Sequence, residues 1–168
     1  TNGDYSEFEK GKEIAFGYVI NGAKTNRFVA AFGRYYKETD MEGTIISMSQ
    51  LNKMDHTHLR NDLCYIFERG IIKRASIWED GVEKRICKEF NGDIMKEYDE
   101  DKYLRYEGSY IDDIKQGYPR TGKGKLFDES GRVITEGDIE GTILKEYRGS
   151  DKGSYTEYYY REALDCPA

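Results

Sequence analysis

The sequence predicts an all-β protein, a meander of short antiparallel strands joined by tight turns. Three observations predict it: glycines recur at regular intervals, aromatic residues are frequent and proline is scarce. Of 168 residues, 18 are Gly and two are Pro, and Phe, Trp and Tyr make up 14%. Glycine adopts the positive φ of tight turns, and a shortage of proline leaves backbone N–H groups free for sheet hydrogen bonds. Because aromatic residues suit pleated strands, all three observations favour the same fold.

The glycines repeat most clearly in two segments, 8–33 and 67–92, which align without gaps. In each segment three glycines stand 11 positions apart, which fits one strand and its share of a turn. Several follow Asn or Asp, and such dipeptides are typical of type I′ hairpin turns, which need positive φ at both central residues. The glycines are Gly11, Gly22 and Gly33 in the first segment and Gly70, Gly81 and Gly92 in the second, and the dipeptides are Asn21-Gly22, Asp80-Gly81 and Asn91-Gly92.

A third region, 106–141, continues the glycine pattern at a longer spacing. Gly108 and Gly131 are 23 positions apart, close to two of the shorter intervals. Apolar pairs stand before Asp128 and after Gly131, and this arrangement predicts a hairpin with a longer loop. The segment 111–121, which contains a proline, is expected to be a lengthened connection.

Two stretches do not fit the glycine pattern, and they divide the chain into four expected parts. Residues 47–62 lack glycine and alternation, so we expect a linker or irregular insertion there. Residues 150–168 are rich in tyrosine and are expected to form a cap, as a helix or as a last strand, because the end of a sheet needs cover. The other parts are degenerate hairpin repeats over 1–46 and a longer repeat array over 63–149.

One repeat is better defined than the others. Its residues are Tyr106-Glu-Gly108-Ser-Tyr110 and Gly122-Lys-Gly124-Lys-Leu126, and Thr135-Glu-Gly137 repeats its start with Thr for the aromatic residue. This pattern resembles the MORN repeat (membrane occupation and recognition nexus), and the resemblance covers 65–140 and, in a more degenerate form, 5–36. It implies an elongated, twisted antiparallel β-meander of hairpin repeats without catalytic residues. Such an array serves as a scaffold, an oligomerisation surface or a docking surface, with lipid binding proposed for some members.

The charge balance excludes one class of partner and disfavours another. The formal net charge is −6, from 26 Lys and Arg against 32 Asp and Glu. Nucleic-acid binding needs a basic footprint, so we expect no nucleic-acid partner. An acidic chain also adheres poorly to an anionic membrane surface. The two signs are finely mixed, as in Glu83-Lys84-Arg85, which is typical of solvated faces.

The cysteines and the hydropathy pattern bear on the compartment. Cys64, Cys87 and Cys166 are an odd number with no close pair, which does not suggest a disulfide framework. Reduced thiols are the expectation, and they favour a cytoplasmic location. No apolar stretch approaches the roughly 18 residues that a membrane-spanning helix needs.

No motif indicates catalysis. On a strand, His56 and His58 would share one face and could form half of a metal site, but no third ligand stands nearby except Asp55 or Asp62. The run from Gly122 to Lys125 is too short for a phosphate-binding loop. Pairs of acidic residues are expected by chance in a chain with 32 of them. The sequence therefore predicts no enzyme, no cofactor and no metal site.

Binding is the expected activity instead, through tyrosines in excess of what a small core needs. We expect a scaffold or adaptor that binds a protein partner, or another copy of itself, through a Tyr-rich sheet face. The expected contact residues are Trp78, Tyr103, Tyr106, Tyr110, Tyr158, Tyr159 and Tyr160. One alternative is a peripheral membrane or phosphoinositide-binding module using Lys73, Arg74, Lys84, Arg85, Lys88, Lys123 and Lys125. Another is an accessory or inhibitor domain of a larger enzyme or toxin system.

Overall fold

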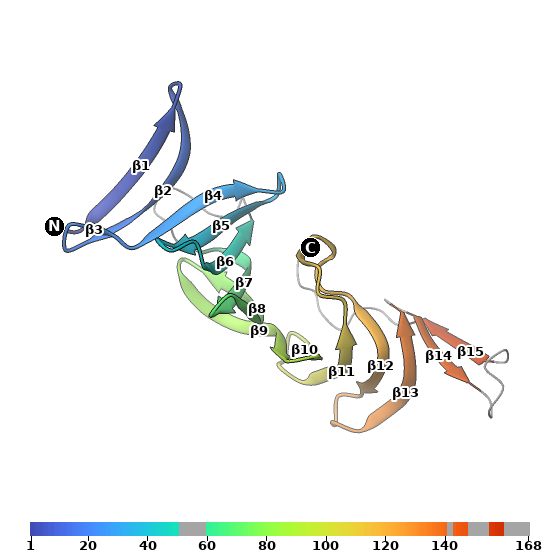
Figure 1. The fold of residues 1–168 in the computed structure, drawn as a ribbon. Helices are drawn as coiled ribbons and strands as arrows, with labels where there is room; N and C mark the ends of the chain where they lie inside the picture. The colour runs from blue at the N-terminus through green and yellow to red at the C-terminus, as the bar shows by residue number, and fades with distance from the viewer. Residues whose placement is uncertain (51–59, 141–142, 148–154, 160–168) are drawn as a thin grey trace. The chain divides into compact units, whose positions relative to one another are not determined.

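The structure is a computed structural model that describes residues 1–50, 60–140, 143–147 and 155–159 (Figure 1). These residues form fifteen β-strands and one short 3-10 helix, so the all-β prediction is confirmed. The chain divides into two compact units, 1–84 and 85–168, and the boundary falls within one strand.

The N-terminal unit is an antiparallel meander in which nearly every strand pairs with its neighbours in the chain. The strand order is β1-β2-β4-β5-β6-β7-β8, and the two-residue β3 pairs only with β2. Its strands are β1 (Gly3–Glu9), β2 (Lys12–Ile20), β3 (Ala23–Lys24), β4 (Asn26–Ala31), β5 (Tyr35–Asp40), β6 (Ile45–Gln50), β7 (Asp62–Glu68), β8 (Ile71–Glu79) and the start of β9 (Val82–Asn91). Phe16 and Phe28 stack at 5.1 Å between ring centroids in its core.

The C-terminal unit continues with the same topology, in the order β9-β10-β11-β12-β13-β14-β15. Its further elements are β10 (Ile94–Tyr98), β11 (Leu104–Tyr110), the 3-10 helix η1 (Ile114–Gln116), β12 (Arg120–Phe127), β13 (Val133–Glu140), β14 (Ile143–Tyr147) and β15 (Tyr155–Tyr159). The helix lies in the predicted long connection. The buried rings of Phe90 and Tyr118, 5.0 Å apart, pack in the core of this unit.

The glycine turns lie where the spacing predicts them. Asn21 and Gly22 both have positive φ, 52° and 81°, as a type I′ turn requires. Asp80-Gly81 is the same. The third dipeptide differs, because Asn91 ends strand β9 and only Gly92 of the pair has positive φ.

Longer hairpin loops share a second device, an aspartate at the first position. The carboxylate of Asp40 accepts hydrogen bonds from the backbone N–H groups two and four residues later, both at 2.9 Å. Asp99, which lies 59 positions further along the chain, repeats this arrangement, and so does Asp128 in the predicted hairpin loop. Local bonds of this kind are typical of aspartate in turns.

The structure differs from the sequence prediction between residues 47 and 50. These residues were expected to begin an irregular insertion, but they belong to strand β6. Ser47 and Ser49 point to one face of this strand and Met48 to the other, and all three are buried. Because serine is a polar residue, the sequence shows no alternation of apolar and polar residues here that would predict a strand with a buried serine face. Residues 51–59 of the expected insertion lie outside the described residues.

Candidate functional site

Among the described residues, each unit buries one glutamate on a central strand, and the two glutamates are 59 positions apart. Glu38 lies on β5 with 5% of its surface exposed, and Glu97 lies on β10 with 1%. Burying a carboxylate is costly unless hydrogen bonds or opposite charges replace its water. The partners of each glutamate therefore decide what each site can do.

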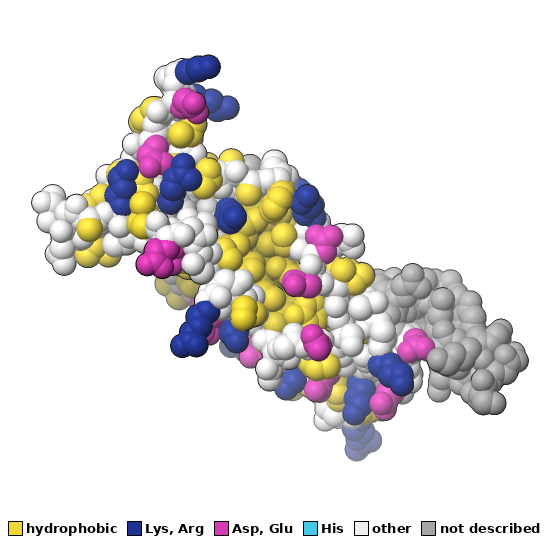
Figure 2. Space-filling view, in the orientation of Figure 1, with side chains coloured by type: hydrophobic (Ala, Val, Ile, Leu, Met, Phe, Trp, Pro, Cys, Tyr) yellow, Lys and Arg dark blue, Asp and Glu magenta, His cyan; other side chains and the backbone are white. Residues whose placement is uncertain are grey.

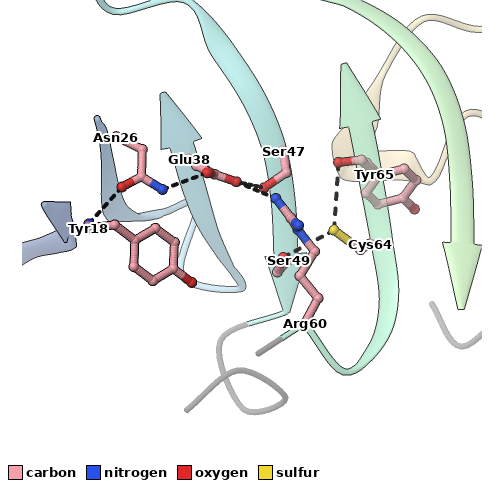
Figure 3. Close-up of polar contacts among 8 residues, drawn as sticks. All are labelled: Tyr18, Asn26, Glu38, Ser47, Ser49, Arg60, Cys64 and Tyr65. Carbon is pink, nitrogen blue, oxygen red and sulfur yellow. Dashed lines mark hydrogen bonds and ion pairs between the residues drawn. The ribbon is translucent and has the colours of Figure 1, made fainter. Parts of the chain in front are cut away.

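The Glu38 centre consists of Asn26, Glu38, Ser47 and Arg60 (Figure 3). The Asn26 side chain donates to one carboxylate oxygen at 2.8 Å. Ser47 Oγ donates to the other at 2.8 Å, and Arg60 Nη2 donates to it at 2.7 Å. Asn26 in turn accepts from the Tyr18 backbone N–H at 2.8 Å. The centre thus links β2, β4, β5 and β6 to Arg60, two residues before β7.

A thiol lies beside this centre on the next row of the sheet. Ser49 Oγ and Cys64 Sγ are 3.2 Å apart, and Cys64 is fully buried and free. Burial raises the pKa of the Cys64 thiol, which keeps it protonated and a poor nucleophile. Cys87, by contrast, is disulfide-bonded, so the expectation of reduced thiols is wrong for this residue.

The Glu97 centre consists of Lys88, Glu97, Tyr106 and Arg120. Arg120 Nε donates to Glu97 Oε2, and Lys88 Nζ is 3.7 Å from Oε1. The guanidinium of Arg120 lies 4.9 Å from the centroid of the Tyr106 ring. Lys88 also donates to the carbonyl of Gly117 at 2.9 Å, so the centre holds the long connection before β12.

Both centres have the character of structural elements. Each carboxylate is enclosed by the donors of neighbouring strands, and Glu97 and Arg120 are almost completely buried. A general acid or base needs an approach for substrate, whereas the described side chains around these two carboxylates are hydrogen-bond donors from neighbouring strands. We therefore interpret the Glu38 and Glu97 centres as structural hydrogen-bond networks that fix the register of the strands.

An open groove lies on the C-terminal unit and encloses about 340 Å³. Strands β9, β10 and β11 form it. Lys96 on the middle strand stands in register with Glu89 on one side and with Glu107 on the other. Ile94 and Asn91 line its end beside the hairpin turn, together with Phe90.

Among the described side chains, the residues predicted to bind a partner do not form one tyrosine face. Tyr103 is 52% exposed, whereas Tyr106 is fully buried and belongs to the Glu97 centre, so the prediction is wrong for Tyr106. Tyr110 is half-buried, and its hydroxyl donates to the Gly92 carbonyl at 2.9 Å. Trp78 is half-buried beneath Arg60, 5.0 Å from ring centroid to guanidinium. The side chains of Tyr158, Tyr159 and Tyr160 lie outside the described residues.

The predicted basic residues also differ in position. Lys88 is only 11% exposed at its side chain and serves the Glu97 centre, and Arg74 pairs with Glu83 at 2.9 Å. The remainder are half-buried (Arg85) or exposed (Lys73, Lys84, Lys123 and Lys125). On β12, Lys125 stands opposite Glu107 on one side and Glu136 on the other. An anionic surface would therefore meet carboxylates beside this lysine.

Two further properties of the described residues bear on the predictions. Within them, no three His, Cys, Asp or Glu side chains gather as metal ligands, and His56 and His58 lie outside them. None of the helical residues described forms a helix long and apolar enough to cross a membrane.

Sequence reasoning missed the two buried glutamates and the groove. One signal could have found the glutamates: the dipeptide Lys-Glu stands at the same distance after the end of both aligned segments, as Lys37-Glu38 and Lys96-Glu97. No protein-family model, curated protein or solved structure matches the chain.

Proposed function

We propose that this chain is a non-enzymatic scaffold that binds a protein partner through the ends of its hairpins. The observation that carries the proposal is the row of exposed apolar side chains at these ends. In an antiparallel meander every second turn lies at the same end of the sheet. The turns at one end of a unit therefore form a common surface.

One end of the N-terminal unit shows the arrangement. Ile20, Met41 and Ile71 lie beside three successive turns at this end and are 51%, 49% and 63% exposed. Two of the turns adjoin, because a Cβ at Gly70 would lie 3.6 Å from the Thr44 side chain. This end thus presents an aliphatic surface.

The other hairpin ends repeat the pattern. Apolar side chains beside the remaining turns are Phe8, Phe32 and Val82 in the N-terminal unit and Ile94, Tyr103, Ile111 and Val133 in the C-terminal unit, all at least 40% exposed. Figure 2 shows hydrophobic side chains at the surface of the described residues, bordered by single Lys, Arg, Asp and Glu side chains. Turns normally carry polar residues, and apolar groups inside a polar rim are typical of protein interfaces.

Crosslinking from the hairpin end tests the proposal. A photo-reactive phenylalanine analogue at position 71, in an extract of cells that express the protein, should crosslink to a partner or to a second copy. The same analogue at position 73, an exposed site on the same strand, is the matched control. A strict monomer with no crosslink from position 71 above the control would contradict the proposal.

Membrane binding has less support, because the exposed lysine Lys125 stands between two glutamates. Liposome flotation with phosphoinositide vesicles would detect it as salt-sensitive binding. The MORN resemblance and the role as an accessory or inhibitor domain stay predictions. So does the cytoplasmic location, against which the disulfide at Cys87 weighs.

A further inference from the structure

We propose that the groove on the C-terminal unit binds an arginine side chain on an extended segment of a partner protein. The inference rests on the proposed protein-binding function, and the groove runs across three strands and meets the hairpin ends at Ile94. Three properties of the groove support it: its size, its charge and its apolar end.

The size suits one side chain and its neighbours. The volume of about 340 Å³ lies at the small end of the range that ligand sites occupy. Glu89 and Glu107 stand on the two outer strands with Lys96 between them, so the carboxylates face the groove from opposite sides. An occupant would lie across three neighbouring strands.

The charge favours a cation. The groove holds the carboxylates of Glu89 and Glu107 and the ammonium group of Lys96, and Lys125 stands opposite Glu107 on the neighbouring strand β12. The pKa of the Tyr98 phenol responds to the charges of these two carboxylates. Burial, and then a hydrogen bond to Glu89 and the charges of Glu89 and Glu107, raise the pKa of Tyr98 to about 12. Both carboxylates therefore act on the same small region.

The apolar end favours arginine over a compact cation. Ile94 is 40% exposed where the groove meets the hairpin turn. The methylene stem of an arginine can pack on such a side chain while the guanidinium bonds a carboxylate in a planar, two-pronged contact. The Asn91 side chain lies beside Ile94 and offers a carbonyl oxygen as a further acceptor.

Removal of the Lys96 charge and removal of a groove carboxylate should change the affinity in opposite directions. The Lys96 ammonium group opposes a bound guanidinium, so its removal should strengthen binding, whereas removal of either carboxylate should weaken it. A hydrophobic surface without charge recognition would show neither change. Glu42 and Glu79, exposed acids of the N-terminal unit, provide a control with the same change in net charge as the two groove glutamates.

The experiment uses the full chain and two labelled peptides, acetyl-Gly-Ile-Arg-Ile-Gly-amide and its citrulline counterpart, which has the same shape without the charge. Fluorescence anisotropy should show the arginine peptide binding about tenfold more tightly. The double variant Glu89→Gln/Glu107→Gln should abolish this preference. Lys96→Gln should tighten binding of the arginine peptide about threefold, and the control Glu42→Gln/Glu79→Gln should leave it unchanged.

Equal binding of the two peptides, no binding at millimolar peptide, or an effect of the control as large as that of the groove variant would overturn the inference. Any of these results, combined with crosslinking from position 71, would remove the groove and leave the hairpin-end function in place. Peptide binding without crosslinking would do the reverse.

Discussion

The Glu38 and Glu97 centres bury the same residue at equivalent positions by different means. Around Glu38, neutral donors (Asn26 and Ser47) share the work with one partly exposed arginine. Around Glu97, two cations replace the neutral donors and the site is closed more completely. The comparison teaches that the meander specifies a buried acid, while the chemistry that neutralises it can vary.

The neighbouring strand explains the difference. Opposite Glu38, strand β6 supplies Ser47, and opposite Glu97 strand β11 supplies Tyr106. Serine donates a hydrogen bond to the carboxylate, whereas the tyrosine hydroxyl turns away to the Ser109 carbonyl at 2.7 Å. The ring instead supports the guanidinium of Arg120. An aromatic residue at this position thus requires a cation to serve the glutamate.

The largest effect is expected from Arg120→Met. It leaves Glu97 in the interior with only Lys88, at 3.7 Å, to balance its charge. We expect a loss of about 3–5 kcal/mol in the free energy of unfolding, measured by urea denaturation. The double variant Glu97→Leu/Arg120→Met should lose less than the single variant, because no buried carboxylate remains. A double variant that is less stable than the single one would contradict this account.

The second-largest effect is expected from Gly108→Ser, which adds a side chain where the Tyr106 side chain already lies. A Cβ at Gly108 would lie 2.6 Å from Tyr106 Oη and 2.6 Å from the Gly124 Cα. At the equivalent place β6 carries Ser49. Gly108→Ser should therefore cost about 2–3 kcal/mol in thermal or urea unfolding, as overpacking does. Gly3→Ala, where no atom lies within 4 Å of the added Cβ, is the control and should cost far less.

This glycine also shows which features of the fold could be predicted from the sequence. The Tyr106-Glu-Gly108 motif and the glycine turns are local signals, because a single residue must allow a turn or a close approach. Burial of Glu97 is not local: it depends on Lys88 and Arg120, which come from strands on either side of β10 and β11. The sequence could show that these charges exist, but only the strand register brings them together.

The same limit applies to the tyrosines and to β6. Composition indicated a surplus of tyrosine, yet Tyr103 and Tyr106, three positions apart, are exposed and buried respectively. Tyr103 precedes strand β11, where no neighbour covers it, and Tyr106 lies inside the strand. Strand β6 escaped prediction because its buried serines are satisfied by Glu38 and Cys64, partners that lie on neighbouring strands.

A third prediction compares the arginines directly. Arg60→Met removes one donor from Glu38, but Asn26 and Ser47 remain, and the arginine side chain is 26% exposed so that water can replace it. We expect a loss of about 1–2 kcal/mol, less than half the effect of Arg120→Met. Urea unfolding of the two variants under one condition measures the ratio. Equal losses of stability in the two variants would show that Asn26 and Ser47 do not help to stabilise the Glu38 carboxylate.

A smaller effect is expected at the repeated loops. Asp40 and Asp99 make the same two backbone contacts, but Asp99 also pairs with Arg105 at 3.2 Å. Asp99→Ala should therefore cost about 1 kcal/mol and Asp40→Ala about half as much. The difference between the two losses should become smaller at high salt, because salt screens the ion pair between Asp99 and Arg105. A salt-independent difference would mean that the loops differ in some other way.

The smallest effect concerns alkaline pH and compares one tyrosine in each unit. The pKa values of Tyr18 and Tyr98 are both raised to about 12, chiefly by burial, with Glu38 acting on the first and Glu89 and Glu107 on the second. A folded-state pKa above the unfolded value of about 10 means that the stabilising contribution is complete below pH 10 and is lost as the pH rises towards 12. Glu89→Gln/Glu107→Gln should lower the pKa of Tyr98 and leave that of Tyr18 unchanged. Absorbance titration at the tyrosinate band, compared with Tyr98→Phe and Tyr18→Phe, separates the two residues, and a shift of Tyr18 would show that the groove charges act beyond their own unit.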